Sequence, residues 1–162
     1  GGRGMSGMLP DAIDILDPDE KTRYIELLTV LANADGALVR EEMAALEAFM
    51  GRAMLRPEER EIVRRALRNP PDFEDVVDGI SDHTLRLALR DSVLLAAADG
   101  EYHPEEIAVL ERMAKLVDID IDVLDELYDW VTEGWTWLAR GRRLLKLEIP
   151  GDELLLGEPD SD

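Results

Sequence analysis

The chain has 162 residues, of which 37 are Asp or Glu and 18 are Lys or Arg, so its formal charge is −19. A polyanion of this strength is repelled by nucleic-acid phosphates and by anionic lipid, which excludes nucleic acid as a general partner and favours cations or basic protein surfaces. The absence of cysteine excludes disulfides, Cys-zinc sites, iron–sulfur clusters and thiol catalysis.

A chain of this length can bury one core of its own, and we expect one domain with a segment at either end. Residues 1–17 form the N-terminal segment, in which Gly1 to Gly4 precede Met5 like an expression remnant. Residues 18–148 form the domain, and residues 149–162 form an acidic tail that we expect to be disordered. No apolar run approaches the roughly 18 residues of a membrane span, and no signal peptide is evident. We therefore expect a cytoplasmic protein.

Apolar residues recur three and four apart throughout the chain, which predicts an all-α fold of about seven to eight helices. Only residues 145–149 resemble a strand. In chain order, we expect helices from residue 18 to the Asp35-Gly36 breaker, over 40–54, 57–68 and 73–77, from 82 to the Asp99-Gly100 breaker, over 104–116, and from Asp120 or Asp122 to Val131. The Trp-rich residues 134–147 form one last helix or two short ones.

Proline and serine mark where these helices begin. Pro18, Pro57 and Pro104 each stand at a first helical position, and Ser81 is a predicted N-cap. The helix that follows Ser81 is apolar on most of its sides, so we expect it to lie at the centre of the bundle.

An internal repeat relates residue n to residue n+64. It aligns LANADGALVREEMAALE (31–47) with LAAADGEYHPEEIAVLE (95–111), with ten identities in 17 positions and no gap. Each copy is a helix–loop–helix unit with an apolar face that it cannot cover alone. We therefore expect the two copies to pack together as one bundle around a pseudo-twofold axis.

The repeated motif, here ADGALVREEM and ADGEYHPEEI, resembles the signature of the tellurite-resistance TerB family and of the related N-terminal domain of the DnaJ-like membrane protein DjlA. The resemblance spans roughly residues 20 to 133. It implies an all-helical domain, a divalent-cation site made by the acidic residues, and a role in metal or chemical stress response, often beside other proteins at the membrane. The Trp-rich segment and the acidic tail depart from the family pattern, so we expect partner specificity to reside there.

The acidic loops are the candidate metal site. Within each repeat, the Asp of Asp-Gly ends one helix and a Glu seven residues later lies in the first turn of the next, so the two carboxylates fold toward each other. Such oxygen ligands suit Ca²⁺, Mg²⁺ or Mn²⁺, bound at one shared site or at two. The glycines permit the positive φ of the bend. The candidate ligands are Asp35, Glu42, Asp99 and Glu106, with Glu41 and Glu105 as secondary candidates. The alternative is that these acids only stop and start helices.

The residues 134–147 form the one basic, aromatic segment of this acidic chain. They either contact a partner or a membrane surface, or they complete the core with Trp while Arg neutralises the acidic body, and composition favours the second interpretation. The tail adds three leucines that form a candidate docking peptide. The candidate partner-binding residues are Trp135, Trp137, Arg140, Arg142, Arg143, Leu154, Leu155 and Leu156.

The sequence has no HExxH, no phosphate-binding glycine loop and no nucleophile elbow, so we expect no enzymatic activity and no organic cofactor. The leading hypothesis is a non-enzymatic domain that binds a divalent cation and acts in a stress-response assembly, in the cytoplasm or at the inner face of the membrane through a protein partner. The alternative is a metal-independent adaptor or scaffold, whose acidic face and C-terminal segment bind a protein.

Overall fold

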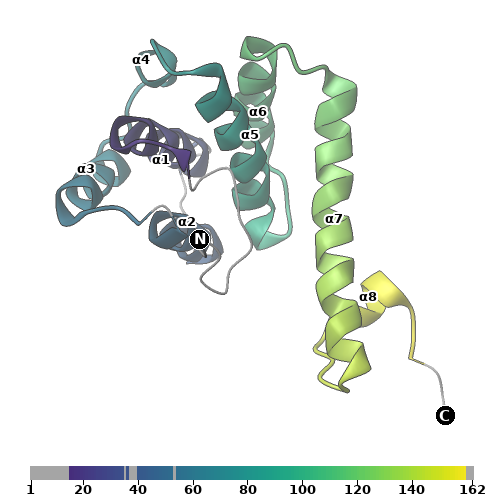
Figure 1. The fold of residues 1–162 in the computed structure, drawn as a ribbon. Coiled ribbons are helices and arrows are strands. Elements are labelled where there is room, and N and C mark those ends of the chain that lie inside the picture. The colour runs from purple at the N-terminus through teal and green to yellow at the C-terminus, as the bar shows by residue number, and fades with distance from the viewer. Residues whose placement is uncertain (1–14, 35, 37–39, 53, 160–162) are drawn as a thin grey trace, which may run out of the picture. The chain divides into compact units, whose positions relative to one another are not determined.

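A computed structural model describes residues 15–34, 36, 40–52 and 54–159, with the backbone alone at residues 52 and 99. The all-α prediction is confirmed: the described residues hold eight α-helices, one 3₁₀ helix and no strand (Figure 1). The chain divides into two compact units, Gly1–Asp120 and Ile121–Asp162. We describe each unit by itself, and the domain boundaries expected at residues 17 and 148 stay predictions.

The first unit contains α1 to α6, and their starts follow the predicted proline and serine positions. In chain order they are α1 (Pro18–Ala32), α2 (Arg40–Arg52), α3 (Pro57–Arg68), α4 (Phe73–Val77), α5 (Asp82–Ala96), the 3₁₀ helix η2 (Ala97–Asp99) and α6 (Pro104–Leu116). The second helix is shorter than predicted, because it ends at Arg52 and Met54 already has a left-handed φ of 53°.

The repeat is present in the structure with the offset of the sequence. Both bounds of α1 move by 64 residues to give those of α5, and the same shift takes α2 to α6. The caps correspond as well: the Asp17 side chain accepts the Glu20 N–H at 2.9 Å, and the Ser81 hydroxyl accepts the Thr84 N–H at 3.1 Å. Two copies of one local sequence have therefore folded into two copies of one structure.

The core of the first unit lies between the first helices of the two repeats. α1 packs most extensively against α5 and also contacts α2, α3, α4 and α6. Its inward side chains, including Ile25, Leu28 and Leu31, are fully buried, and so are Val93 and Leu95 of α5. The predicted central position of α5 is thus borne out, and α1 shares it.

Two arginines hold the short helix α4 in place. Arg23 of α1 donates to the carbonyl oxygen of Val76 at 3.0 Å and to that of Asp78. Arg112 of α6 forms an ion pair with Glu74 and lies over the ring of Phe73, 4.2 Å from its centroid. Both repeats therefore contribute a cation that anchors the segment between them.

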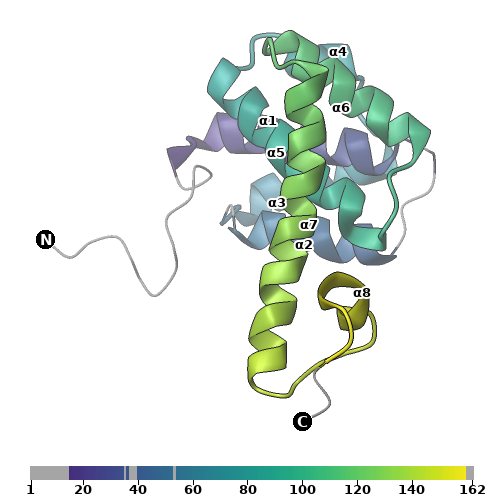
Figure 2. The same cartoon turned by 90° about the vertical axis from the view of Figure 1, so that its right-hand side faces the viewer.

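The second unit contains α7 (Ile121–Leu144) and α8 (Asp152–Leu156), which lie side by side at the C-terminal end of α7 (Figures 1 and 2). α7 is one continuous helix, whereas the sequence predicted an interruption after Val131. It ends in a Schellman motif: Lys146 has φ 57°, its N–H donates to the Arg143 carbonyl, and the Leu147 N–H donates to the Arg142 carbonyl at 2.8 Å. This turn replaces the strand considered at residues 145–149.

The tail needs a correction for its described part, because residues 152–156 are helical rather than disordered. The carboxylate of Asp152 is buried and accepts hydrogen bonds from the Arg142 side chain at 2.7 and 2.9 Å and from the Ile149 N–H at 3.2 Å. The composition of the tail gave no sign of this, because the basic partner lies on α7, ten residues earlier in the chain.

Candidate functional site

The glycines of the two acidic loops share one backbone conformation. Gly36 has φ 79° and Gly100 has φ 88°, which is the left-handed conformation predicted for both. The Gly36 N–H donates to the Asn33 carbonyl at 3.0 Å, and the Gly100 N–H donates to the Ala97 carbonyl at 2.9 Å. The donor and the acceptor of the second bond each lie 64 residues after their counterparts in the first. The bend is therefore a repeated feature.

Glu42 and Glu106 are the candidate ligands that the structure describes in full. Both are fully buried, in the first turns of α2 and α6 respectively. Glutamate is almost never fully buried unless it is paired or coordinates a metal. Glu106 accepts the N–H of His103 at 3.2 Å, which is the reciprocal bond of a capping box. A helix-capping role therefore contributes to its burial.

The remaining candidates divide into two groups. Asp35 lies outside the described residues, and of Asp99 only the backbone, at the end of η2, is described. Glu41 and Glu105 are exposed. Within the described part of the chain, no three His, Asp or Glu side chains are grouped so that they could hold a metal ion. The ligand set and the number of metal sites therefore stay predictions.

Glu59 of α3 occupies the same helical position outside the repeat loops. It is 7% exposed, and its Oε1 atom accepts the backbone N–H of Arg56 at 2.9 Å and the Arg56 Nε–H at 3.1 Å. The backbone hydrogen bond from Arg56 is the main cause that lowers the pKa of this carboxyl below its ordinary value. A Glu three residues after a helix cap was the available sequence signal.

A buried polar network between α1 and α5 was not predicted from the sequence. The Asp91 carboxylate, 1% exposed, accepts the Tyr24 hydroxyl at 2.5 Å and two N–H groups of Arg90 at 2.7 and 3.1 Å. The available signal was an Asp inside a helix that is apolar on most of its sides, since a carboxylate is buried only with partners. This network joins the first helices of the two repeats.

Two arginines of the basic segment form ion pairs within the second unit. Besides the Arg142–Asp152 pair, Arg143 donates to Glu148 at 3.0 Å and to the Gly157 carbonyl at 2.7 Å. The hydrogen bond from Arg142 is the main cause that lowers the pKa of Asp152 below its ordinary value. The interpretation that these arginines neutralise acidic groups is thus supported for the nearest acids in the sequence.

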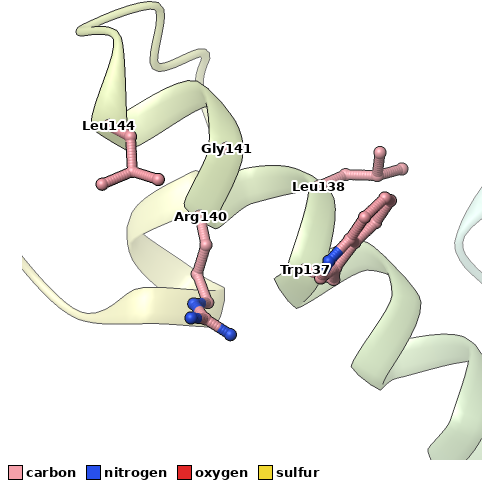
Figure 3. Close-up of a pocket in the computed structure, with 5 residues that line it drawn as sticks. All are labelled: Trp137, Leu138, Arg140, Gly141 and Leu144. Atoms are coloured by element: carbon pink, nitrogen blue, oxygen red, sulfur yellow. The ribbon is translucent and has the colours of Figure 1, made fainter.

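The tryptophans do not complete the core. Trp137 is 68% exposed and Trp135 is 39% exposed, so the core interpretation is wrong for both side chains. In the tail Leu154 is 86% exposed, while Leu155 and Leu156 are half-buried. Trp137, Leu138, Arg140, Gly141 and Leu144 line an open pocket of about 270 Å³ on α7 (Figure 3). That these residues bind a partner stays a prediction.

Comparisons with known proteins agree with this fold. The family described as "Protein of unknown function (DUF533)" matches residues 14–131. Among solved structures, the chain is similar to a tellurite resistance protein from Nostoc punctiforme, with a TM-score of 0.61 and 21% identity over 91% of this chain and 87% of that one. No curated protein matches the sequence. The resemblance read from the repeated motif is therefore confirmed at the level of the fold. No helix in the described ranges is long and apolar enough to cross a membrane.

Proposed function

We propose that this chain, which belongs to the DUF533 family, is a non-enzymatic domain that binds a divalent cation through its two acidic loops in a metal or chemical stress response. The observation that carries the proposal is the pair of fully buried glutamates, Glu42 and Glu106, at positions 64 residues apart. Each follows a left-handed Gly by six residues. Each of the two repeats thus has a buried carboxylate next to its loop. Carboxylate oxygens are hard ligands, which suit Ca²⁺, Mg²⁺ or Mn²⁺.

The similarity to the tellurite resistance protein from Nostoc punctiforme supports the stress-response part of the proposal. The lack of catalytic motifs in the sequence supports its non-enzymatic part. Asp35 and Asp99, each seven residues before one of these glutamates in the sequence, complete the proposed ligand set.

Calorimetric titration of the chelator-treated chain with Ca²⁺, Mg²⁺ and Mn²⁺ tests this proposal. We expect saturable binding that the Glu42→Gln, Glu106→Gln variant loses. The stoichiometry of the wild-type chain, with the two single variants, distinguishes one shared site from two. Circular dichroism verifies that each variant is folded.

Glu59→Gln is the matched control, because it also neutralises a buried glutamate in the first turn of a helix but lies outside the repeat loops. We expect it to bind the cation like the wild-type chain. Equal loss in all variants, or no saturable binding of any cation, would reject the metal site and leave the glutamates as helix caps.

A metal-independent adaptor is the second candidate function. The specific observation in its favour is the exposure of Leu154 and Trp137 in a chain of charge −19. Such a protein would bind a basic protein surface through its acidic face, and complementary charge would make the association salt-dependent. A titration without cation binding, together with a partner whose affinity falls as salt rises, would favour this function.

A further inference from the structure

One side of α7 is apolar and exposed. Trp137 is 68% exposed and Leu144 is 82% exposed. Their neighbours three and four residues apart continue the same side of the helix. We name this side the α7 stripe, and its members are Trp130, Gly134, Trp137, Leu138, Gly141 and Leu144. The fully buried Ala139 and the Asp152-paired Arg142 lie on the other side, which α8 occupies. α8 therefore leaves the α7 stripe uncovered.

Two glycines interrupt the α7 stripe at positions seven residues apart. A Cβ added at Gly134 or at Gly141 would meet nothing within 4 Å, so packing in this chain does not require glycine there. Each glycine nevertheless destabilises the helix relative to alanine. The missing side chain of Gly141 leaves the open pocket between the Trp137–Leu138 pair and Leu144 (Figure 3). A backbone without side chains allows another helix to approach closely.

The charges of α7 are separated along its length. Residues 121–133 contain five acidic residues and no basic one, and residues 134–147 contain four basic residues and no acidic one. Beside the α7 stripe, Glu126, Asp129, Glu133 and Arg140 follow each other at intervals of three, four and seven, so they lie along one edge. The helix dipole favours such a distribution only within the first and last turns. The helix dipole therefore does not explain the acidic residues from the second turn of α7 to Glu133.

We propose that the α7 stripe binds α7 of a second copy of this chain in an antiparallel pair, with Gly134 opposite the partner's Gly141. In this register the two helices overlap over residues 131–144, so Asp129 and Glu133, at the end of the acidic half, lie beside the basic half of the other copy. Arg140 reaches the partner's Glu133 along the shared edge, and twofold symmetry forms this ion pair twice. Trp137 of each copy packs beside the pocket that the facing Gly141 leaves open.

Charge favours a second copy over a lipid surface as the occupant. Arg142 and Arg143 are already paired with Asp152 and Glu148, and the acidic half of α7 continues the same exposed edge. A helix that lies on an anionic membrane instead needs a basic edge along its length. An antiparallel partner places its basic residues beside Glu133 and its acidic residues beside Arg140, which a lipid surface does not do.

Sedimentation equilibrium of the full chain tests the proposal. We expect a mass of twice 18.2 kDa at about 100 µM and above. Gly141→Glu places a charged side chain in the pocket and should weaken association at least tenfold. Gly51→Glu is the matched control, since Gly51 is also an exposed helical glycine with open space at its Cβ, but lies on α2. It should leave association unchanged.

A charge exchange tests the register. Arg140→Glu and Glu133→Arg should each weaken the dimer, and the double variant should restore it, because the ion pairs re-form with reversed sign. A mere effect on helix stability would not be restored in this way.

Disulfide trapping tests the direction, because the chain has no cysteine of its own. A mixture of Gly134→Cys and Gly141→Cys chains should form a crosslinked dimer, whereas either variant alone should not. Self-crosslinking of each variant would indicate a parallel pair and overturn the proposal. A wild-type chain that stays monomeric at 500 µM would overturn it, and so would a monomer that floats with anionic phosphatidylserine vesicles.

Discussion

The two repeats share the bounds of their first two helices and differ in how their third helix ends. α3 and α7 begin 64 residues apart, like the two helix pairs that precede them. α3 stops at Arg68, before Asn69-Pro70-Pro71, whereas the equivalent positions after α7 has begun are Glu133-Gly134-Trp135, and the helix continues to Leu144. Proline ends a helix because it lacks an N–H and clashes with the preceding turn, but glycine only weakens it. The second repeat thereby gains a helical extension, and this extension carries the exposed α7 stripe.

The repeats also differ at the centre of the bundle. Asp91 and Tyr24 form a buried hydrogen bond, yet their equivalents in the other repeat are Leu27 and Ala88. A fold made of two identical copies would place the same residues on both sides of its axis. The asymmetric pair fixes which copy contributes the donor and which the acceptor.

The largest effect is expected when the asymmetric pair is broken. Asp91→Ala removes the acceptor of both Tyr24 and Arg90 and should lower the free energy of unfolding by about 3 kcal/mol. Urea denaturation followed by circular dichroism measures this loss. Ser92→Ala is the control, because Ser92 is also buried on α5 but its hydroxyl has no hydrogen-bond partner among the described residues. It should change stability by less than about 1 kcal/mol. Equal losses would mean that the network does not distinguish the repeats.

An effect of similar size is expected when a proline replaces Gly134, the position that corresponds to Pro70 of the first repeat. Gly134→Pro removes a helical hydrogen bond and should cost α7 about 3 kcal/mol. Amide hydrogen exchange should show lost protection after residue 133, with protection of α1 and α5 retained. Gly134→Ala should instead strengthen the helix, by about 0.5 to 1 kcal/mol, because a Cβ there has open space. Retained protection in the proline variant would contradict this explanation of the extension.

Equivalent glycines should respond equally. Gly36→Ala and Gly100→Ala each force a side chain into the left-handed region and should each cost about 1 to 2 kcal/mol in thermal or urea unfolding. Gly51→Ala, on an ordinary helical backbone, should stabilise the chain by about 0.5 to 1 kcal/mol. If one of these two substitutions left the free energy of unfolding unchanged, the two loops would not be equivalent in solution.

The smallest effect concerns the tail and its dependence on pH. Arg142 lowers the pKa of Asp152 in the folded state, so the contact of α8 with α7 is fully present at neutral pH and is lost as pH falls through that lowered pKa. The amide resonance of Ile149, which donates to Asp152, should report this transition in an NMR titration. Asp152→Asn should abolish the transition at Ile149. A midpoint at or above the ordinary pKa of aspartate would contradict the assigned ion pair.

Local sequence determined the fold class, the helix starts and the repeat. Proline at a first helical position, Ser81 as an N-cap and glycine at a left-handed bend act within a few residues, so Pro57, Ser81 and Gly100 could be placed without tertiary information. The repeated motif identified Glu42 and Glu106 as candidate ligands, but their burial depends on the packing of the helices around them.

Tertiary structure alone decided which polar groups meet. Asp91 finds Tyr24 from 67 residues away, and Asp152 orders part of a tail that is acidic enough to suggest disorder. It also decided that Trp137 is exposed rather than part of the core. Caps and breakers act over one helical turn and are written in adjacent residues, whereas burial depends on what another segment brings, which no short window of sequence contains.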